Sequence, residues 1–410
     1  MQRQLSPAEA SVFSKGDRIS TNSTLQLPEL TRPVNILVLG AKVLTTDIQN
    51  PPANLKKMRY QALVNSFDGL TDTMLLLRFN PDAKKLVALS IPRDTRTQIP
   101  GFGVTKINEA NADGGPALSA RATSELLGGV GIDRYVTINV QGVQALVDAL
   151  GGVTVYVPKD MKYRDDSQHL YVNLKAGQQH LNGDQALQLL RFRHDEFGDI
   201  GRIQRQQMVM RSLMEQTLNP ATLARLPQIL SIIQSHIDTN LSVEELVALV
   251  GFAAHINRSQ VQMLMVPGSF SQPSEYNGIS YWLPSPQRIQ GMMAQHFDFG
   301  TATAQTVNAS STRVVIQDSM HQNSALQAVM NQLRQAGYGN VSTTTLNREP
   351  LRVTRIVAQQ GDVESAEAVR RSLGFGEVRI ESTGDLDSDV TVQVGQDWSQ
   401  GRSSAQSSTN

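Results

Sequence analysis

The chain has 410 residues, of which 40% are hydrophobic and 18% are charged, a composition typical of a globular protein with two or more domains. Lysine plus arginine and aspartate plus glutamate both total 37, so the formal net charge of zero gives no electrostatic case for a nucleic-acid partner. The absence of cysteine excludes disulfides, thiol nucleophiles and zinc–thiolate sites.

Residues 1–33 are polar, lack a hydrophobic period and are predicted to form a flexible linker. The sequence contains neither an apolar run of about 18 residues nor the hydrophobic region of a signal peptide. If the protein works at a membrane, we therefore expect an N-terminal anchor that is missing from this sequence.

Ordered structure is expected to begin with a short buried strand at 34–40 that ends at a glycine. A polar insert at 45–68 separates it from two apolar strands at 72–79 and 85–91, which the turn Asn80-Pro-Asp-Ala83 joins into a hairpin. Further helices are expected at 117–127, 143–150, 183–191, 201–218, 221–236, 242–255 and 286–297, and further strands at 135–140, 153–157 and 261–266. Because strands and helices alternate, we predict an α/β or α+β fold with a central mixed sheet flanked by helices.

These elements make residues 34–300 the first predicted domain, and the small polar residues at 301–312 indicate a linker to a second domain at 313–397. In the second domain strands are expected at 313–317, 353–358, 377–380 and 390–394, and helices at 324–335 and 363–373. This pattern is typical of a small α/β or α+β domain. Residues 398–410 are predicted to be a disordered tail.

The segment Ser90-Ile-Pro-Arg-Asp-Thr-Arg96 leaves the end of a buried strand, where ligand sites of open sheets are often found. Because a hairpin places the start of one strand beside the end of the next, Asp72 is expected to approach Arg93 and Asp94. Two carboxylates and an arginine at one point suit a Mg²⁺–phosphate site, and a local salt bridge on a turn is the alternative. Lys106, in a loop after two glycines, is either a further cation of this site or simply solvated.

The stretch RFRHDEFGDIGRIQRQQ at 191–207 contains four arginines in a chain without net charge. Arg191 and Arg193 would point the same way in an extended segment. Arg202 and Gln206 share a face at the start of the next helix, and Asp199 lies at or near its N-cap. Arginine binds phosphate in a bidentate manner, so an anionic ligand is expected, and a solvated, internally paired loop is the alternative.

Six motifs in consistent order resemble those of the LytR-CpsA-Psr family. They are NILVLG, TDTMLLLRFNP, SIPRDT, KIN, NGDQAL and RFRHDEFGDIGRIQRQ. The resemblance covers about residues 34–300, and residues 313–397 look like the small LytR C-terminal domain that often follows. We read this second domain as a binding or spacing module.

The resemblance implies a membrane-anchored bacterial phosphotransferase at the extracytoplasmic face of the cytoplasmic membrane. Such an enzyme moves a glycopolymer phosphate from a polyprenyl-pyrophosphate carrier to cell-wall peptidoglycan, with Mg²⁺, or Mn²⁺ in its place, as cofactor. The implied pyrophosphate ligands are Arg93, Lys106, Arg191, Arg193, Arg202 and Gln206, and the implied metal ligand is Asp72. The implied catalytic set adds Asp94 and Asp199 to the arginines, as support for them or for the metal. The polyprenyl chain would lie in an apolar tunnel between sheet and helices, with Val136, Ile138, Val140 and Leu189 as its lining.

One departure from the family pattern concerns the metal. The family usually has an aspartate two residues after the glycine of the first strand, where this chain has Lys42. Either the metal has fewer carboxylate ligands, with Asp47 or Asp68 as substitutes, or Lys42 takes over part of its charge. Two alternatives to the transferase stay open: a polyprenyl-pyrophosphate phosphatase that uses water as acceptor, and a non-catalytic protein that binds lipid or wall polymer, which the Lys42 departure favours somewhat. The concentration of charged residues favours an active site, since a scaffold would not need so many desolvated charges together.

Overall fold

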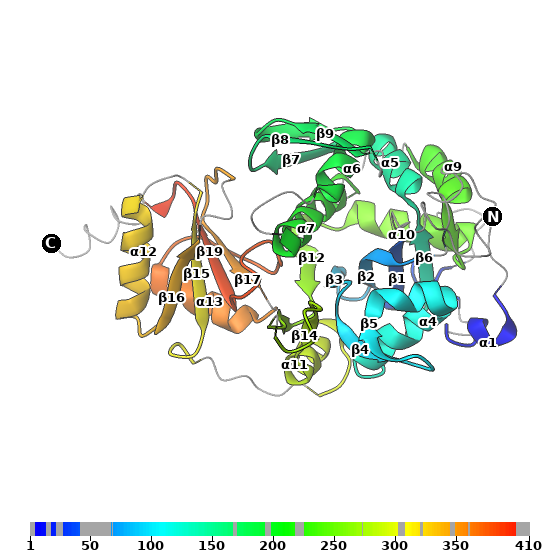
Figure 1. Cartoon of the computed structure of the whole chain (residues 1–410), viewed down its shortest axis with the longest axis horizontal. Helices are drawn as coiled ribbons and strands as arrows, with labels where there is room; N and C mark the ends of the chain where they lie inside the picture. The colour runs from blue at the N-terminus through cyan, green and yellow to red at the C-terminus, as the bar shows by residue number, and fades with distance from the viewer. Residues whose placement is uncertain are drawn as a thin grey trace.

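The computed structural model describes residues 5–13, 18–21, 28–41, 67, 69–166, 170–192, 198–217, 225–272, 274–301, 308–319, 323–344, 349–359 and 361–398. Over these ranges the chain forms two units, each built around its own sheet, which lie side by side (Figure 1). Within the same ranges no helix is long and apolar enough to cross a lipid bilayer.

The first unit is built on a six-stranded mixed sheet with the order β11-β6-β1-β2-β3-β12. Its strands are β1 (Val34–Ala41), β2 (Thr71–Asn80), β3 (Lys85–Ile91), β6 (Arg134–Ile138), β11 (Ile237–Thr239) and β12 (Val261–Met265). The strands β1, β2 and β3 are antiparallel neighbours, whereas β6 runs parallel to β1 and β12 runs parallel to β3. In the β2–β3 hairpin Met74 pairs with Ile91, so the start of β2 lies beside the end of β3.

Alternation of side chains along the strands gives this sheet two apolar faces. One face, which includes Leu37 and Leu39, packs against α4 (Ala110–Leu126) and α11 (Pro286–Phe297). The other face, which includes Val34 and Ile36, packs against α7 (Gly198–Thr217) and α10 (Val243–His255). Helices therefore cover the sheet on both sides (Figure 1).

An outer layer lies beyond α7 and consists of two small antiparallel sheets with flanking helices. Its elements are α5 (Val140–Ala149), β7 (Val153–Val157), β8 (Met161–Asp165), β9 (Leu170–Leu174), β10 (Gly177–Leu181), α6 (Gly183–Arg191) and α9 (Leu226–His236). Val155, Leu189, Phe192 and Val209 belong to the apolar cluster that joins this layer to α7. The remaining short elements of the first unit are α1 (Pro7–Ala10), β4 (Arg96–Ile99), β5 (Gly103–Lys106), η1 (Ile107–Glu109), η2 (Arg258–Gln260), β13 (Gly268–Phe270) and β14 (Trp282–Pro284).

The second unit is built on a five-stranded sheet with the order β16-β15-β19-β17-β18 and has its own apolar core. Its elements are β15 (Arg313–Asp318), α12 (Asn323–Gln335), β16 (Asn340–Thr344), β17 (Arg355–Ala358), α13 (Val363–Leu373), β18 (Glu377–Arg379) and β19 (Val390–Val394). Trp398, expected in a disordered tail, packs against this core.

The α+β class and the central mixed sheet are confirmed, and three local expectations are wrong. Val140 begins α5 rather than ending a strand, because the Asn139 side chain accepts a hydrogen bond from the Gly142 N–H and caps the helix. The helix expected at 117–127 begins at Ala110, since a kink at Gly114 and Gly115 joins two helical pieces.

The third correction concerns the segment expected to be a linker, residues 1–33. Within it, Phe13 is 3% exposed and Ile19 is fully buried, and each belongs to one of the two clusters that cover the sheet. These two positions therefore belong to the first unit.

The sequence also did not predict nine short strands, which are β4, β5, β8, β9, β10, β11, β13, β14 and β16.

Candidate functional site

A pocket opens where β3 ends and β2 begins. Its walls are Asp72, Thr73, Met74 and Leu75 from β2, Ser90, Ile91, Pro92, Arg93 and Asp94 from the end of β3, Gln206, Gln207 and Met210 from α7, and Met265, Phe270 and Trp282. Charged residues at the ends of β2 and β3 thus share the pocket with apolar residues such as Met265, Phe270 and Trp282.

Four charged side chains form a continuous row at this edge. The Arg93 Nη1 lies 2.6 Å from the Asp72 Oδ1, and the Arg93 Nε lies 3.3 Å from the Asp94 Oδ2. The Lys106 Nζ lies 2.8 Å from the other Asp94 oxygen. These side chains keep between 14% and 25% of their surface exposed, so they are only partly desolvated and open to a ligand. The predicted approach of Asp72 to Arg93 and Asp94 is confirmed, and Lys106 is part of the row.

The turn that carries Arg93 and Asp94 is held from several sides. The Thr95 N–H and hydroxyl both donate to the Pro92 carbonyl, at 3.0 and 2.6 Å. The Asn108 N–H donates to the Arg93 carbonyl, and the Trp282 N–H donates to the Asp94 carbonyl. With these backbone groups paired, the side chains of Arg93 and Asp94 project from a fixed frame.

Aromatic residues from 270–282 form the side of the pocket that sequence analysis missed. The Phe270 and Trp282 rings meet edge to face at 5.0 Å, and the Trp282 Nε1 donates to the Val266 carbonyl. The Lys106 Nζ lies 5.6 Å from the centre of the Tyr281 ring, a cation–π distance. The tyrosines and the tryptophan of this segment were the only available sequence signal. Because the segment is distant in sequence from the charged motifs, nothing in the sequence indicated that it lies at the pocket.

Helix α7 supplies the pocket with Gln206, Gln207 and Met210. The Gln207 Nε2 donates to the Ser90 Oγ over 2.6 Å, which connects the helix to the end of β3. Arg205 has a structural role instead, because it is 4% exposed and its guanidinium donates to the Phe192 carbonyl. One of the four arginines of the 191–207 stretch therefore connects α6 to α7.

The other predicted site residues are distributed as follows. Arg191 is half-buried at the end of α6 and does not line the pocket. Asp199 and Arg202 lie in α7 one to two turns before Gln206, and their side chains lie outside what the structure describes. The residues that fall wholly outside the described ranges are Arg193, Lys42, Asp47 and Asp68.

Two of the four residues predicted to line a lipid tunnel, Leu189 and Val136, lie in different apolar clusters. Leu189 is fully buried in the outer-layer cluster, whereas Val136 is half-buried on the face of the sheet that α7 and α10 cover. Val38, which pairs with Val136, and the half-buried Leu77 and Met210 pack against the same cluster, and these four residues are called the apolar strip. Because Met210 also lines the pocket, this half-buried apolar strip begins at the pocket.

Among the described residues there is no group of three or more histidine or acidic side chains that could hold a metal ion. Asp72 and Asp94 each give one carboxylate to the pocket. This number suits Mg²⁺, which is commonly bound by one or two carboxylates together with water and substrate phosphate.

The fold and the pocket define an α+β protein with a row of cations and carboxylates at a sheet edge, next to an apolar strip. Residues 6–298 match the model of the LytR_cpsA_psr family, and residues 311–398 match that of the LytR cell envelope-related transcriptional attenuator. The chain therefore belongs to the LytR-CpsA-Psr family.

Curated relatives and solved structures agree with this assignment. The chain is 34% identical to the polyisoprenyl-teichoic acid–peptidoglycan teichoic acid transferase TagU of Oceanobacillus iheyensis over 231 residues, 54% of this chain and 68% of the relative. It is 36% identical to the regulatory protein MsrR of Staphylococcus aureus over 173 residues, 42% of this chain and 51% of the relative. The crystal structure of Bacillus subtilis TagV matches with a TM-score of 0.53 and 25% identity, covering 66% of this chain and 99% of that one.

Proposed function

We propose that the protein transfers a glycopolymer phosphate from a polyprenyl-pyrophosphate carrier to cell-wall peptidoglycan. The observation that supports this most directly is the row of Asp72, Arg93, Asp94 and Lys106 beside an apolar strip. A carrier with an anionic head and a long apolar tail needs both surfaces next to each other. The relatives TagU and TagV are named teichoic acid transferases, which is the same class of reaction.

In this reaction the acceptor hydroxyl attacks the phosphorus that carries the glycan, and the bond from that phosphorus to the bridging oxygen breaks. Polyprenyl phosphate leaves with the electron pair, and the hydroxyl proton passes to a base. Catalysis of phosphoryl transfer depends mainly on positioning and on stabilising negative charge. Arg93 and Lys106 would supply cations at the pyrophosphate, and Asp72 and Asp94 hold them in place through ion pairs. The resemblance to the family adds Arg191, Arg193, Arg202 and Gln206 to this set.

We assign Mg²⁺, with Mn²⁺ as the alternative, to the carboxylates of Asp72 and Asp94. When bound, the metal would neutralise pyrophosphate charge. The half-buried strip of Val38, Leu77, Val136 and Met210 is the proposed start of the polyprenyl site. Because the carrier is a membrane lipid and the acceptor is cell wall, we place the working protein at the extracytoplasmic face of the cytoplasmic membrane.

A turnover assay tests the proposal with purified protein, Mg²⁺, a synthetic polyprenyl-pyrophosphate glycan and peptidoglycan fragments, followed by mass spectrometry. We expect a glycan–phosphate–peptidoglycan adduct, formed on the order of 10²–10³ times more slowly by the Arg93→Ala variant. Arg164→Ala is the matched control, since the Arg164 side chain is 72% exposed on the β8–β9 hairpin and its ion pair is with the similarly solvated Asp166. Free glycan phosphate without adduct would indicate a phosphatase, and lipid binding without turnover would indicate a binding protein.

A further inference from the structure

The second unit contributes directly to the wall of the pocket. Leu386, in the loop between β18 and β19, is 2% exposed and packs in one cluster with Met265 and Trp282, with Phe270 packed against it. Met265, Trp282 and Phe270 all line the pocket of the first unit. The apolar side of the pocket is therefore backed by a side chain from the other unit.

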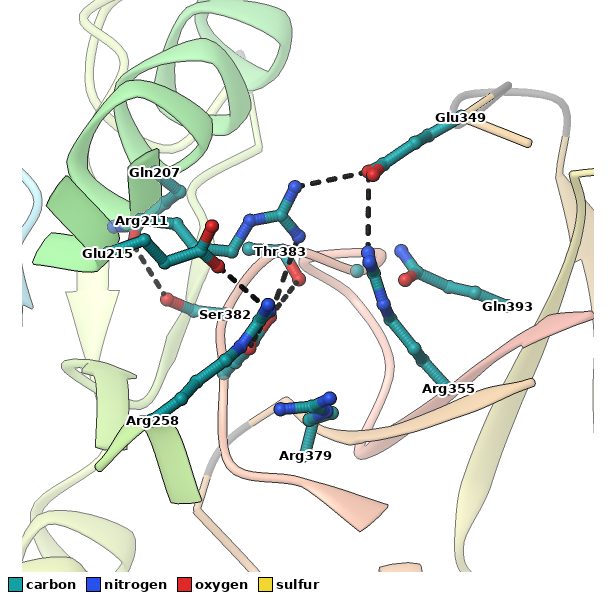
Figure 2. Close-up of polar contacts among 12 residues, drawn as sticks. Gln207, Arg211, Glu215, Arg258, Glu349, Arg355, Arg379, Ser382, Thr383 and Gln393 are labelled. Carbon is teal, nitrogen blue, oxygen red and sulfur yellow. Dashed lines mark hydrogen bonds and ion pairs between the residues drawn. The ribbon is translucent and has the colours of Figure 1, made fainter. Parts of the chain in front are cut away.

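A second contact reaches the pocket through a hydrogen-bonded chain. The Ser382 Oγ donates to the Gln207 Oε1 over 3.0 Å (Figure 2). The Gln207 Nε2 in turn donates to the Ser90 Oγ over 2.6 Å. Ser382 is fully buried and Gln207 is 4% exposed, so water cannot easily replace either partner. The Gln207 amide thus has both polar ends paired, its oxygen with Ser382 of the second unit and its nitrogen with Ser90 of β3.

One turn further along α7, an ion cluster joins the two units (Figure 2). The Arg211 guanidinium lies 3.1 Å from the Glu349 Oε2 and 3.7 Å from the Glu381 Oε2. Burial acts to lower the pKa of Arg211, but the carboxylates of Glu381 and Glu349 outweigh it and raise that pKa. Arg258 of η2 lies 3.8 Å from the Glu381 Oε1, so Glu381 is shared between two cations of the first unit.

The loop that makes these contacts is held rigidly by its own unit and by the first. The Gln204 Nε2 of α7 donates to the Gly384 carbonyl, and the Met263 N–H of β12 donates to the Ile380 carbonyl. The Gly384 N–H in turn donates to the Gln359 side chain. A Cβ at Gly384 would lie 2.3 Å from the Thr391 Oγ1, so this close approach requires glycine.

We infer that the second unit is a working part of the candidate active site, in which Ser382 and Glu381 are positioning residues. They act through Gln207 and Arg211 to set the place of α7 against β3, and Leu386 completes the pocket wall. The effect on kcat that we expect rests on the proposed function, whereas the contacts between the two units do not depend on that function. Since α7 carries Gln206 and Met210 into the pocket, a shift of this helix would move groups that face the substrate.

Kinetics of the full-length chain test the inference with the variants Ser382→Ala and Glu381→Gln. A misplacement of about 1 Å in a positioning element can cost on the order of 10²-fold in rate, so we expect kcat to fall at least about 10-fold while KM for the polyprenyl-pyrophosphate glycan changes less. Ser382→Thr keeps the hydroxyl and should restore most of kcat. Glu364→Gln is the matched control, because Glu364 is an exposed carboxylate in the first turn of α13.

A second measurement follows the wall itself. In a Trp398→Phe background the fluorescence emission of Trp282 reports whether Leu386 covers it, and we expect Leu386→Ala to shift that emission to longer wavelength.

Unchanged kcat in Ser382→Ala and Glu381→Gln, or a higher kcat, would overturn the inference and leave the proposed function intact. If the wild type forms no adduct, the proposed function fails instead. The inference is then decided by binding of synthetic polyprenyl pyrophosphate, which the two variants should weaken and which an unaltered affinity would contradict.

Discussion

His296 makes the stability of the folded chain depend on pH in a direction that can be worked out. It lies on α11, is 3% exposed, and its Nε2 is 3.0 Å from the Gly361 carbonyl oxygen of the second unit. Burial lowers the pKa of His296 from 6.5 to about 4, the Gly361 carbonyl acts to raise it, and Lys85 acts to lower it. Its other ring nitrogen lies 2.8 Å from the Gln262 side-chain oxygen, so the neutral ring requires the amide to present its nitrogen there.

The sign follows from proton binding. Between pH 6.5 and about 4 the unfolded chain binds a proton at this position and the folded chain does not, so acidification favours unfolding across this window. The predicted loss from this one group is about 2 kcal/mol at pH 5, and it reaches about 3 kcal/mol below pH 4.

Urea unfolding at pH 7.5 and pH 5 measures this contribution. The wild type should lose about 2 kcal/mol more between the two pH values than a His296→Gln variant, which keeps polar groups but does not titrate. His255→Gln is the matched control for the substitution itself, because His255 is exposed on α10. Equal pH dependence in the wild type and His296→Gln would refute the reasoning.

Three further changes have definite expected outcomes. Glu245→Gln should cost about 3–5 kcal/mol in urea unfolding, because it leaves the buried Arg134 guanidinium without the carboxylate that lies 2.7 Å away. Gly183→Ala should lower the melting temperature, with a cost of about 1–3 kcal/mol, since its Cβ would lie 2.2 Å from the Gln144 carbonyl oxygen where α5 and α6 meet. Lys106→Met should slow transfer by on the order of 10²-fold in the turnover assay, because it removes one of the cations at the pocket.

The β2–β3 hairpin shows what the sequence could predict. Two apolar strands joined by a short turn fix their own register, and this register alone brings Asp72 to Arg93 and Asp94. The same local logic located most helices of both units. The short strands could not be predicted because few of their residues are buried, which leaves a weak hydrophobic signal. In β8, for example, exposed residues alternate with less exposed ones.

The contacts of Leu386, Ser382 and Glu381 could not have been predicted in this way. Each joins residues more than a hundred positions apart, as Ser382 and Gln207 do, and no local period encodes such a pairing. The expectation of a binding or spacing module followed from the lack of a catalytic constellation in the sequence of the second domain. The core of that domain is separate, but the loop before β19 is shaped to fit the first unit rather than solvent.

The polar residues of the 191–207 stretch have different roles, and not every arginine among them faces the ligand. Arg205 is buried and holds the end of α6. Gln206 lines the pocket, and Gln207 both lines it and accepts from Ser382 of the second unit. Because successive helical positions point in different directions, α7 contacts the outer layer, the pocket and the second unit at once. A helix with three such neighbours has little freedom to shift, and the groups that it brings to the pocket are placed by all three.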